Sequence, residues 1–207
     1  RSSLNTEIQI IADNALKKGL LQYDKRHGFR GPIANDVSNN WHLKYIKNNP
    51  PHNFLIAKIT KFNEKNNNAQ IEVILNGKII DAEIINFEWA RKSLSGDYLG
   101  PKVNKVSDVL KLNDIIYVSS NSENRFNLEQ IPKINGGIIV MDPYTGRVFA
   151  LSGGFDFNKS NFNRAIQAKR QPGSSFKPFV YMSALENGLQ PNSLILDAPF
   201  VVDQGSD

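Results

Sequence analysis

The sequence predicts an α+β fold, because helical and strand-like patterns occupy separate stretches of the chain. Apolar residues recur every three to four positions between residues 6 and 21, and again after residue 176. Between these stretches, short alternating or apolar runs are bounded by polar, Asn-rich or Gly-containing segments, as in antiparallel strands. Segregation of helices from strands is typical of α+β rather than α/β proteins.

The first helix is predicted from Thr6 to about Leu21. Thr6 and Gln9 have the spacing of a capping box, and a polar segment with Gly28, Gly31 and Pro32 follows the helix. His27, His42 and His52 have no second ligand at metal-binding spacing, so we expect solvated loop residues there. The apolar positions predicted to share one face of the helix are Ile8, Ile11, Ala12, Ala15, Leu16 and Leu20.

Five short strands are predicted in the middle of the chain, and they suggest a small antiparallel barrel of the OB type. Asn76-Gly77 between two apolar runs is a strong signal for a type I′ hairpin. The aromatic residues of this region fall mostly inside alternating runs, so we expect them to fill the barrel rather than to bind nucleic acid. The predicted strands are 53–62, 70–75, 79–87, 112–118 and 126–131, and the aromatic residues are Phe54, Phe62, Phe87, Trp89 and Tyr117.

A second strand pair is predicted after the barrel. Residues 137–141 form an apolar run, residues 142–146 have the composition of a turn, and residues 147–152 form the returning strand. Gly153-Gly154 then begins a loop that leads to the next helix.

Ser174 and Lys177 lie three positions apart at the start of that helix. A turn at residues 171–173 precedes them, and apolar residues recur until Asn187-Gly188, where the helix should stop. Side chains at this spacing share a face, so the Lys177 amine can reach the Ser174 hydroxyl and, when neutral, take its proton. Burial and a helix N-terminus both disfavour the ammonium form, and the same terminus offers N–H groups for an oxyanion hole. Alternatively, Ser174 is an N-cap and Lys177 a solvated residue, because about one S-x-x-K is expected by chance.

The residues around this turn resemble the serine region of class A penicillin-binding proteins, the bifunctional enzymes of bacterial peptidoglycan synthesis. The resemblance implies that Ser174 is the acyl-enzyme nucleophile, acylated also by β-lactams, and that Lys177 is its general base. It implies no metal or organic cofactor. The matching segments are GG at 136–137, MDPYTG at 141–146, FDF at 155–157, SNFNRA at 160–165, QA at 167–168, RQPGSSFKP at 170–178, Tyr181 and DAP at 197–199.

The resemblance also implies a domain organisation and a set of partners. One subgroup of the family carries an OB-like domain between an entrance helix and the body of the transpeptidase domain. We therefore expect an entrance helix and linker at 1–44, an OB-like insertion at 45–133 and a truncated transpeptidase domain at 134–207. The implied partners are stem peptides and glycan strands of peptidoglycan, β-lactams, and cell-wall synthesis proteins that bind the OB-like domain.

Two further motifs of penicilloyl-serine transferases do not follow Ser174 in this sequence. No K-[TS]-G occurs, and the S-x-N matches at Ser3, Ser38, Ser119 and Ser122 all precede Ser174. The chain starts at Arg1 and contains neither a glycosyltransferase domain nor a membrane anchor. We therefore expect an inactive fragment, and the resemblance implies that its parent protein is anchored in the inner membrane and works in the periplasm.

Composition excludes several kinds of site. There is no cysteine, which excludes disulfides, thiolate zinc sites and cysteine nucleophiles. The net charge of +5 comes from lysines spread along the chain, a pattern typical of a solvated surface and suited to an anionic cell envelope. No run approaches the roughly 18 apolar residues of a membrane span.

Three other functions remain open from the sequence. A class A β-lactamase also has S-x-x-K, although the long segment before the serine fits that family poorly. A binding module would use the OB-like barrel to hold single-stranded nucleic acid or glycan. A structural fragment would associate with itself through its apolar faces.

Overall fold

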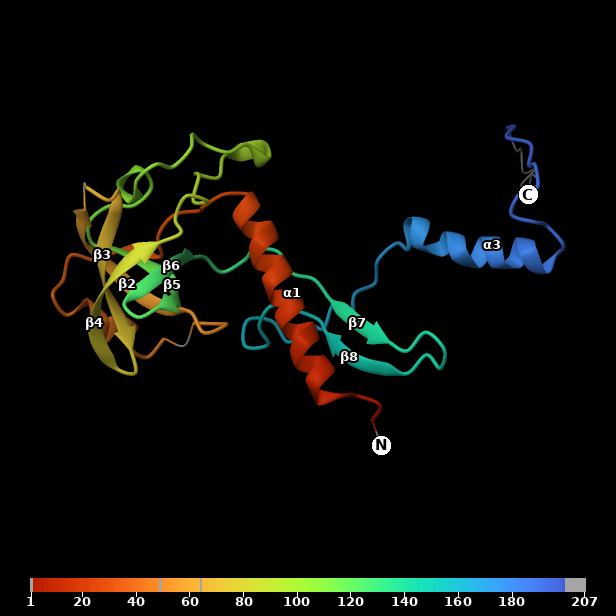
Figure 1. The fold of residues 1–207 in the computed structure, drawn as a ribbon, viewed down its shortest axis with the longest axis horizontal. Coiled ribbons are helices and arrows are strands. Elements are labelled where there is room, and N and C mark those ends of the chain that lie inside the picture. The colour runs from red at the N-terminus through yellow and green to blue at the C-terminus, as the bar shows by residue number, and fades with distance from the viewer. Residues whose placement is uncertain (1, 49, 64, 200–207) are drawn as a thin grey trace, which may run out of the picture. The chain divides into compact units, whose positions relative to one another are not determined.

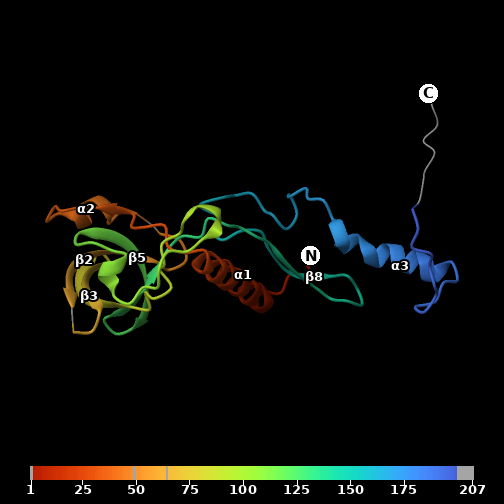
Figure 2. The ribbon, with the colours of Figure 1, turned by 90° about the horizontal axis from the view of Figure 1, so that it is seen from above.

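The computed structural model describes residues 2–48, 50–63 and 65–199, which form an α+β structure (Figures 1 and 2). The chain divides into two compact units, Arg1–Ala168 and Lys169–Asp207. The first contains a long helix, a two-stranded sheet and a closed β-barrel, and the second contains a 3₁₀ turn with Ser174 and the helix that begins at Lys177. No helix in the described residues is long and apolar enough to cross a membrane.

Helix α1 spans Thr6–Arg26, and its N-cap is Asn5. The Asn5 Oδ1 accepts hydrogen bonds from the N–H groups of Glu7, at 3.0 Å, and Ile8, at 3.1 Å. The predicted capping box of Thr6 and Gln9 is therefore wrong. The reason lies far along the chain: the Asn5 N–H donates to the Phe149 carbonyl at 2.8 Å, which holds Asn5 in the extended conformation of an N-cap.

The buried face of α1 follows a four-residue spacing. Ala12 and Leu20 are buried, and Leu16 between them is partly buried. Ile11, which we expected on this face, is 66% exposed, and Ala15 is exposed as well. The predicted apolar stripe is thus narrower in the structure, because only the positions that face the strand pair and the barrel are covered.

The strand pair consists of β7 (Ile138–Met141) and β8 (Val148–Ser152), which run antiparallel with Ile139 opposite Leu151. This confirms the predicted hairpin. In the connecting turn, the Asp142 carboxylate accepts from the Thr145 hydroxyl and from the Tyr144 N–H, and these bonds lower the Asp142 pKa.

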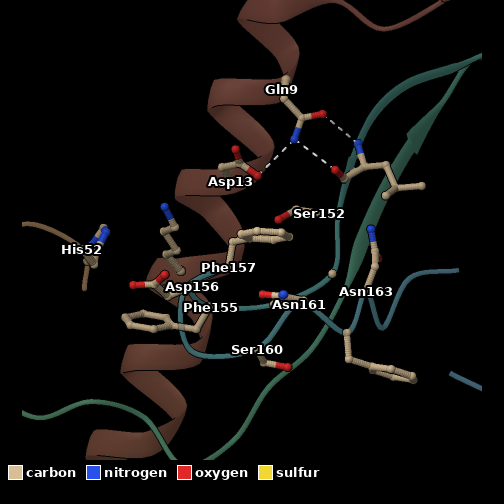
Figure 3. A pocket seen from close by; sticks show the side chains of 15 residues that line it. Gln9, Asp13, His52, Ser152, Phe155, Asp156, Phe157, Ser160, Asn161 and Asn163 are labelled. Carbon is tan, nitrogen blue, oxygen red and sulfur yellow. Dashed lines mark hydrogen bonds between the residues drawn. The ribbon is translucent and has the colours of Figure 1, made fainter. Parts of the chain in front are cut away.

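Side-chain hydrogen bonds join α1 to the edge of β8 (Figure 3). The Gln9 amide donates to the Leu151 carbonyl at 3.1 Å and accepts from the Leu151 N–H at 3.0 Å. Ser3 Oγ donates to the Val148 carbonyl at 2.7 Å. Gln9 therefore satisfies backbone groups of the sheet edge, rather than the helix terminus to which its sequence spacing assigned it.

The barrel confirms the predicted OB-like fold. Its sheet runs in the order β1-β5-β2-β3-β4-β6, and β6 also pairs with β5, which closes the ring of five strands. All pairings are antiparallel except β4 with β6, which is parallel. The strands are β1 (Ala34–Asn35), β2 (Leu55–Asn63), β3 (Asn68–Leu75), β4 (Lys78–Ile85), β5 (Asp114–Ser122) and β6 (Arg125–Glu129), with short 3₁₀ turns at Ser95–Asp97 and Val106–Asp108.

The hairpin between β3 and β4 confirms the type I′ prediction. Asn76 has φ of 50° and Gly77 has φ of 75°, as both central residues of such a turn require. Its register places inward-facing apolar residues of the two strands together in the barrel core. The fully buried side chains of this core include Ile59, Ile71, Val73, Ile84, Val106, Leu110, Val118 and Leu128.

The aromatic residues of the barrel divide into two groups. Phe87 is buried in the barrel core, and Phe62 and Trp89 pack against it, as predicted. Phe54 and Tyr117 instead belong to a cluster outside the barrel that also contains Leu20 and Phe155. That cluster joins the barrel to α1 and to the loop after β8.

A segment before β2 covers the outer side of the sheet. β1 pairs with β5, and helix α2 (Trp41–Tyr45) follows. Trp41 is 1% exposed, and its Nε1 donates to the Glu72 carboxylate at 2.8 Å. β1 and α2 thus pack on the barrel sheet, although both begin before residue 45. The domain boundaries expected at 44/45 and 133/134 stay a prediction.

A buried carboxylate joins the end of α1 to both connections of the barrel. Asp24 is 3% exposed and accepts two hydrogen bonds from the Arg30 guanidinium, at 3.0 and 2.9 Å. It also accepts from Gln130 Nε2 at 2.7 Å and from the Lys133 N–H at 3.0 Å. Arg30 lies where the chain enters the barrel, and Gln130 and Lys133 lie where it leaves. One side chain therefore fixes both crossings against the helix.

Candidate functional site

The loop that leaves β8 is held by a close backbone contact at Gly153. A Cβ atom at this position would lie 1.9 Å from Asn163 Oδ1 and 2.6 Å from the Arg164 backbone nitrogen, so only glycine fits. The Arg164 N–H donates to the Gly153 carbonyl at 3.0 Å, and its guanidinium donates to the Phe162 carbonyl at 2.9 Å. These bonds fold residues 153–164 back on themselves.

The second unit begins with the turn that carries the candidate serine. Gly173 has φ of 54°, and a 3₁₀ turn, Gly173–Phe176, runs directly into helix α3 (Lys177–Glu186). Pro178 lies in the first turn of α3, where its missing N–H has no cost. The predicted helix is confirmed, but the turn before it lies at Pro172–Ser175 rather than at 171–173, because the Ser175 N–H donates to the Pro172 carbonyl at 3.2 Å.

The stop signal of α3 is also confirmed. Asn187 is the C-cap, and its side-chain amide donates to the Ser183 carbonyl at 2.7 Å. Gly188 has φ of +88° and allows the chain to leave the helix.

Ser174 and Lys177 lie three positions apart, at the two ends of one helical turn. The Lys177 N–H donates to the Ser174 carbonyl, which fixes their backbones one turn apart. Both side chains are exposed, and within residues 65–199 no hydrogen bond joins Ser174 Oγ to Lys177 Nζ. Ser174 is not the N-cap of α3, because that position is Phe176. The alternative prediction that Ser174 is the N-cap of this helix is therefore wrong.

The α3 helix is apolar on more than one side. No side chain of α3 is buried in the structure, and its large apolar residues are about half exposed or more. A helix with apolar residues all round is normally covered on most sides. These residues are Phe179, Val180, Tyr181, Met182 and Leu185.

Sequence reasoning found the serine turn but missed a pocket in the first unit. The pocket is lined by polar residues of α1, by His52 and by the loop after β8. Gln9, Asp13 and Lys17 are spaced four residues apart, so a polar stripe beside the apolar one was the signal that could have revealed it.

Two family models match the chain. Residues 29–134 match a penicillin-binding protein OB-like domain, and residues 136–207 match a penicillin binding protein transpeptidase domain. The first range contains the whole barrel, and the second contains the β7–β8 pair, Ser174 and Lys177.

Curated relatives match over nearly the whole chain. Penicillin-binding protein 1A of Rickettsia typhi is 42% identical over 205 residues, which cover 99% of this chain and 25% of that protein. The proteins of the same name from Pseudomonas aeruginosa and Escherichia coli are 37% and 35% identical, over 100% and 96% of this chain. The chain thus spans about a quarter of the length of these relatives. It covers 25% of the Pseudomonas aeruginosa protein and 24% of the Escherichia coli protein.

A solved structure has a similar fold. The crystal structure of penicillin-binding protein 1A from Haemophilus influenzae aligns with a TM-score of 0.68 and 25% sequence identity. The alignment covers 100% of this chain and 30% of that protein.

Proposed function

Since this chain belongs to the class A penicillin-binding proteins, we propose that it carries the nucleophile of a serine D,D-transpeptidase in peptidoglycan synthesis. One observation supports this most. Ser174 lies in the turn that leads into α3, and Lys177 follows one turn later, inside the segment that matches a transpeptidase domain. That arrangement puts a hydroxyl nucleophile and an amine that could act as its base one helical turn apart.

In the proposed reaction, Ser174 Oγ attacks the carbonyl carbon between the two terminal D-alanines of a donor stem peptide. The neutral Lys177 amine takes the hydroxyl proton, and the terminal D-alanine leaves with that proton as the peptide bond breaks. The donor remains as an ester on Ser174. An amine of an acceptor peptide then attacks the ester, forms the cross-linking amide and returns a proton to Ser174. A β-lactam would follow the first step only, by opening of its ring amide.

The start of the helical segment, at the 3₁₀ turn that contains Ser174, suits this chemistry electrostatically. Unpaired N–H groups at a helix start complement the negative oxygen of a tetrahedral intermediate. The same positive potential disfavours a lysine ammonium, as a general base requires. Because Ser174 and Lys177 are exposed here, exclusion of water would come from bound substrate or from other parts of a longer protein.

We also propose the setting in which this reaction takes place. The chain would belong to a longer, bifunctional protein with a glycosyltransferase domain and an inner-membrane anchor, with this part in the periplasm. Stem peptides, glycan strands and β-lactams are its proposed ligands. The OB-like barrel would bind other cell-wall synthesis proteins. Phe54 and Phe87 are buried, so they offer no stacking surface for nucleic acid.

The proposal is tested by mass spectrometry of the full-length protein after exposure to a labelled penicillin. We expect one adduct, on the peptide that contains Ser174, and none in Ser174→Ala. Ser175→Ala is the matched control and should still be labelled. Lys177→Ala should slow acylation by about 10²-fold or more, the contribution typical of a general base. An adduct on another residue, or labelling of Ser174→Ala, would refute the assignment.

A second experiment concerns the 207 residues alone. We propose that they do not turn over, because the sequence contains no K-[TS]-G motif to complete the cleft. The measurement is release of D-alanine from a stem peptide that ends in two D-alanines. Release above the level of Ser174→Ala would contradict this part of the proposal.

A further inference from the structure

A pocket of about 490 Å³ opens between α1 and the loop that follows β8 (Figure 3). Gln9, Asp13 and Lys17 line it from the helix, and His52 lines it from the segment before β2. Residues 151–157 and 160–163 form the remaining wall. The volume falls within the range of about 300–1,000 Å³ found for small-ligand sites, and pockets of this kind are common where two parts of a protein meet.

The walls of the pocket are held in place by contacts that need no ligand. Gly153 is locked against Asn163 and Arg164, as described above. Gln9 is fixed by its two bonds to Leu151 and by a third, from its Nε2 to Asp13 Oδ1 at 3.0 Å. Phe155 is 4% exposed, and its ring packs 5.7 Å from that of His52. A ligand would therefore bind a preformed surface at little conformational cost.

The exposed groups of the pocket combine an aromatic ring with several uncharged or acidic hydrogen-bonding groups. Phe157 is 73% exposed although it is large and apolar. Among the residues that the structure describes, Asp13 Oδ1 accepts from Gln9 and Asp156 Oδ1 accepts from the Asn158 N–H, and neither Oδ2 has a hydrogen-bond donor, so each Oδ2 is available as an acceptor. Ser152 and Asn161 add a hydroxyl and an amide.

The charges of the pocket nearly cancel. Lys17 offsets one of the two carboxylates, and burial together with the nearby Lys17 ammonium lowers the pKa of His52, so its imidazole is neutral at pH 7. A strongly charged ligand would therefore gain little. A neutral ligand with many hydroxyl groups could use the free carboxylate oxygens as acceptors and lay its apolar C–H face on the Phe157 ring.

We propose that this pocket binds an N-acetylhexosamine unit of a glycan strand. The choice of saccharide rests on the proposed function, because a peptidoglycan enzyme meets such strands. The acetamido group of the sugar would pair with the Asn161 side-chain amide, and its ring would stack on Phe157. The site lies in the first compact unit and uses no residue of the serine turn.

A short peptide is the competing ligand. Its N-terminal ammonium could pair with Asp13 and its C-terminal carboxylate with Lys17. Such a peptide would not need to stack on Phe157. The two ligands therefore depend on different side chains, and this difference decides between them.

The test titrates the 207-residue chain with triacetylchitotriose and follows backbone amides by NMR. We expect shifts that saturate at Gly153, Gly154 and Asn161. Phe157→Ala should weaken binding by roughly threefold to tenfold, the range expected for loss of one aromatic contact. Tyr144→Ala is the matched control, because Tyr144 is 94% exposed in the β7–β8 turn outside the pocket, and it should leave binding unchanged.

Three outcomes would overturn the proposal. These are the absence of saturable shifts at the pocket, equal affinity in Phe157→Ala, and larger shifts there with the unblocked tripeptide lysyl-D-alanyl-D-alanine than with the sugar. Because Phe157 is largely exposed, its replacement should leave amide signals outside the pocket in place, which verifies folding. Ser174→Ala should bind the sugar normally. A failed penicillin experiment would therefore refute the proposed nucleophile, whereas a failed sugar titration would refute only the proposed saccharide site.

Discussion

The barrel and helix α3 use their apolar side chains in opposite ways. In β2 to β6, Ile59, Ile71 and Leu128 are at most 1% exposed, and they pack in one continuous core. In α3, Phe179 is 63% exposed and Met182 is 57% exposed, and no side chain of the helix is buried in the structure. The segment proposed to carry the chemistry is thus the one with the fewest stabilising contacts of its own.

This difference separates stability from activity. Substitutions in the barrel and at its junction with α1 should unfold the first unit, while substitutions on α3 should change acylation with little effect on folding of these 207 residues. Both tryptophans, Trp41 and Trp89, lie in the first unit, so fluorescence during urea unfolding reports on that unit.

The largest effect is expected at the junction. Asp24→Ala removes the acceptor for Arg30, Gln130 and the Lys133 N–H, and it leaves a guanidinium with no carboxylate partner there. Loss of one partner of a buried ion pair costs about 3–5 kcal/mol. Urea unfolding should show a correspondingly lower midpoint. Asp81→Ala, at an exposed position of β4, is the control and should stay within about 0.5 kcal/mol of the parent.

A matched pair of truncations tests the comparison directly. Ile59→Ala empties a fully buried position of the barrel and should cost about 2–5 kcal/mol. Phe179→Ala removes a larger side chain from an exposed position of α3 and should cost no more than about 0.5 kcal/mol. Equal losses in urea unfolding would show that α3 is covered in the isolated chain, and the contrast between the two regions would then be wrong.

A smaller effect separates the two candidate caps of α1. Asn5→Ala removes the Oδ1 that accepts from the Glu7 and Ile8 N–H groups, and it should cost about 1 kcal/mol. Thr6→Ala should cost less than about 0.5 kcal/mol, because Thr6 is not the cap. A larger loss for Thr6→Ala than for Asn5→Ala would restore the capping box that the sequence predicted.

The smallest effect concerns His52 and pH. Its pKa is lowered in the folded chain, chiefly by burial, so the unfolded state binds more protons between the folded pKa and the unfolded value near 6.5. His52 therefore contributes stability above about pH 6.5 that is lost as pH falls through this window. His52→Asn, which tolerates the φ of 57° at this position, should remove that dependence. Parallel pH profiles of the two proteins in urea would contradict the prediction.

Local signals in the sequence predicted local structure well. The Asn76-Gly77 turn, the five barrel strands to within a few residues, and the stop at Asn187-Gly188 all followed from short-range patterns. Each depends on the φ that a residue tolerates or on the period of apolar side chains, and both are properties of a few neighbouring residues.

Long-range contacts decided what those patterns could not. Asn5 is the cap because Phe149 holds its N–H, and Gln9 serves the edge of β8 because Leu151 lies beside it. Ile11 is exposed because nothing in residues 2–48, 50–63 and 65–168 of the first unit covers that side of α1. The parallel pairing of β4 with β6 likewise depends on barrel closure.

The sequence by itself determined the α+β class, the OB-like barrel and the serine turn with its family resemblance, because composition, periodicity and spacing carry that information along the chain. Only the tertiary structure decided how Asp24 joins the barrel to α1 and how the pocket beside Phe157 forms. Those features bring together residues more than a hundred positions apart, such as Asp24 with Gln130 and Gln9 with Leu151. No short-range pattern encodes such pairings, because their geometry exists only after the chain has folded.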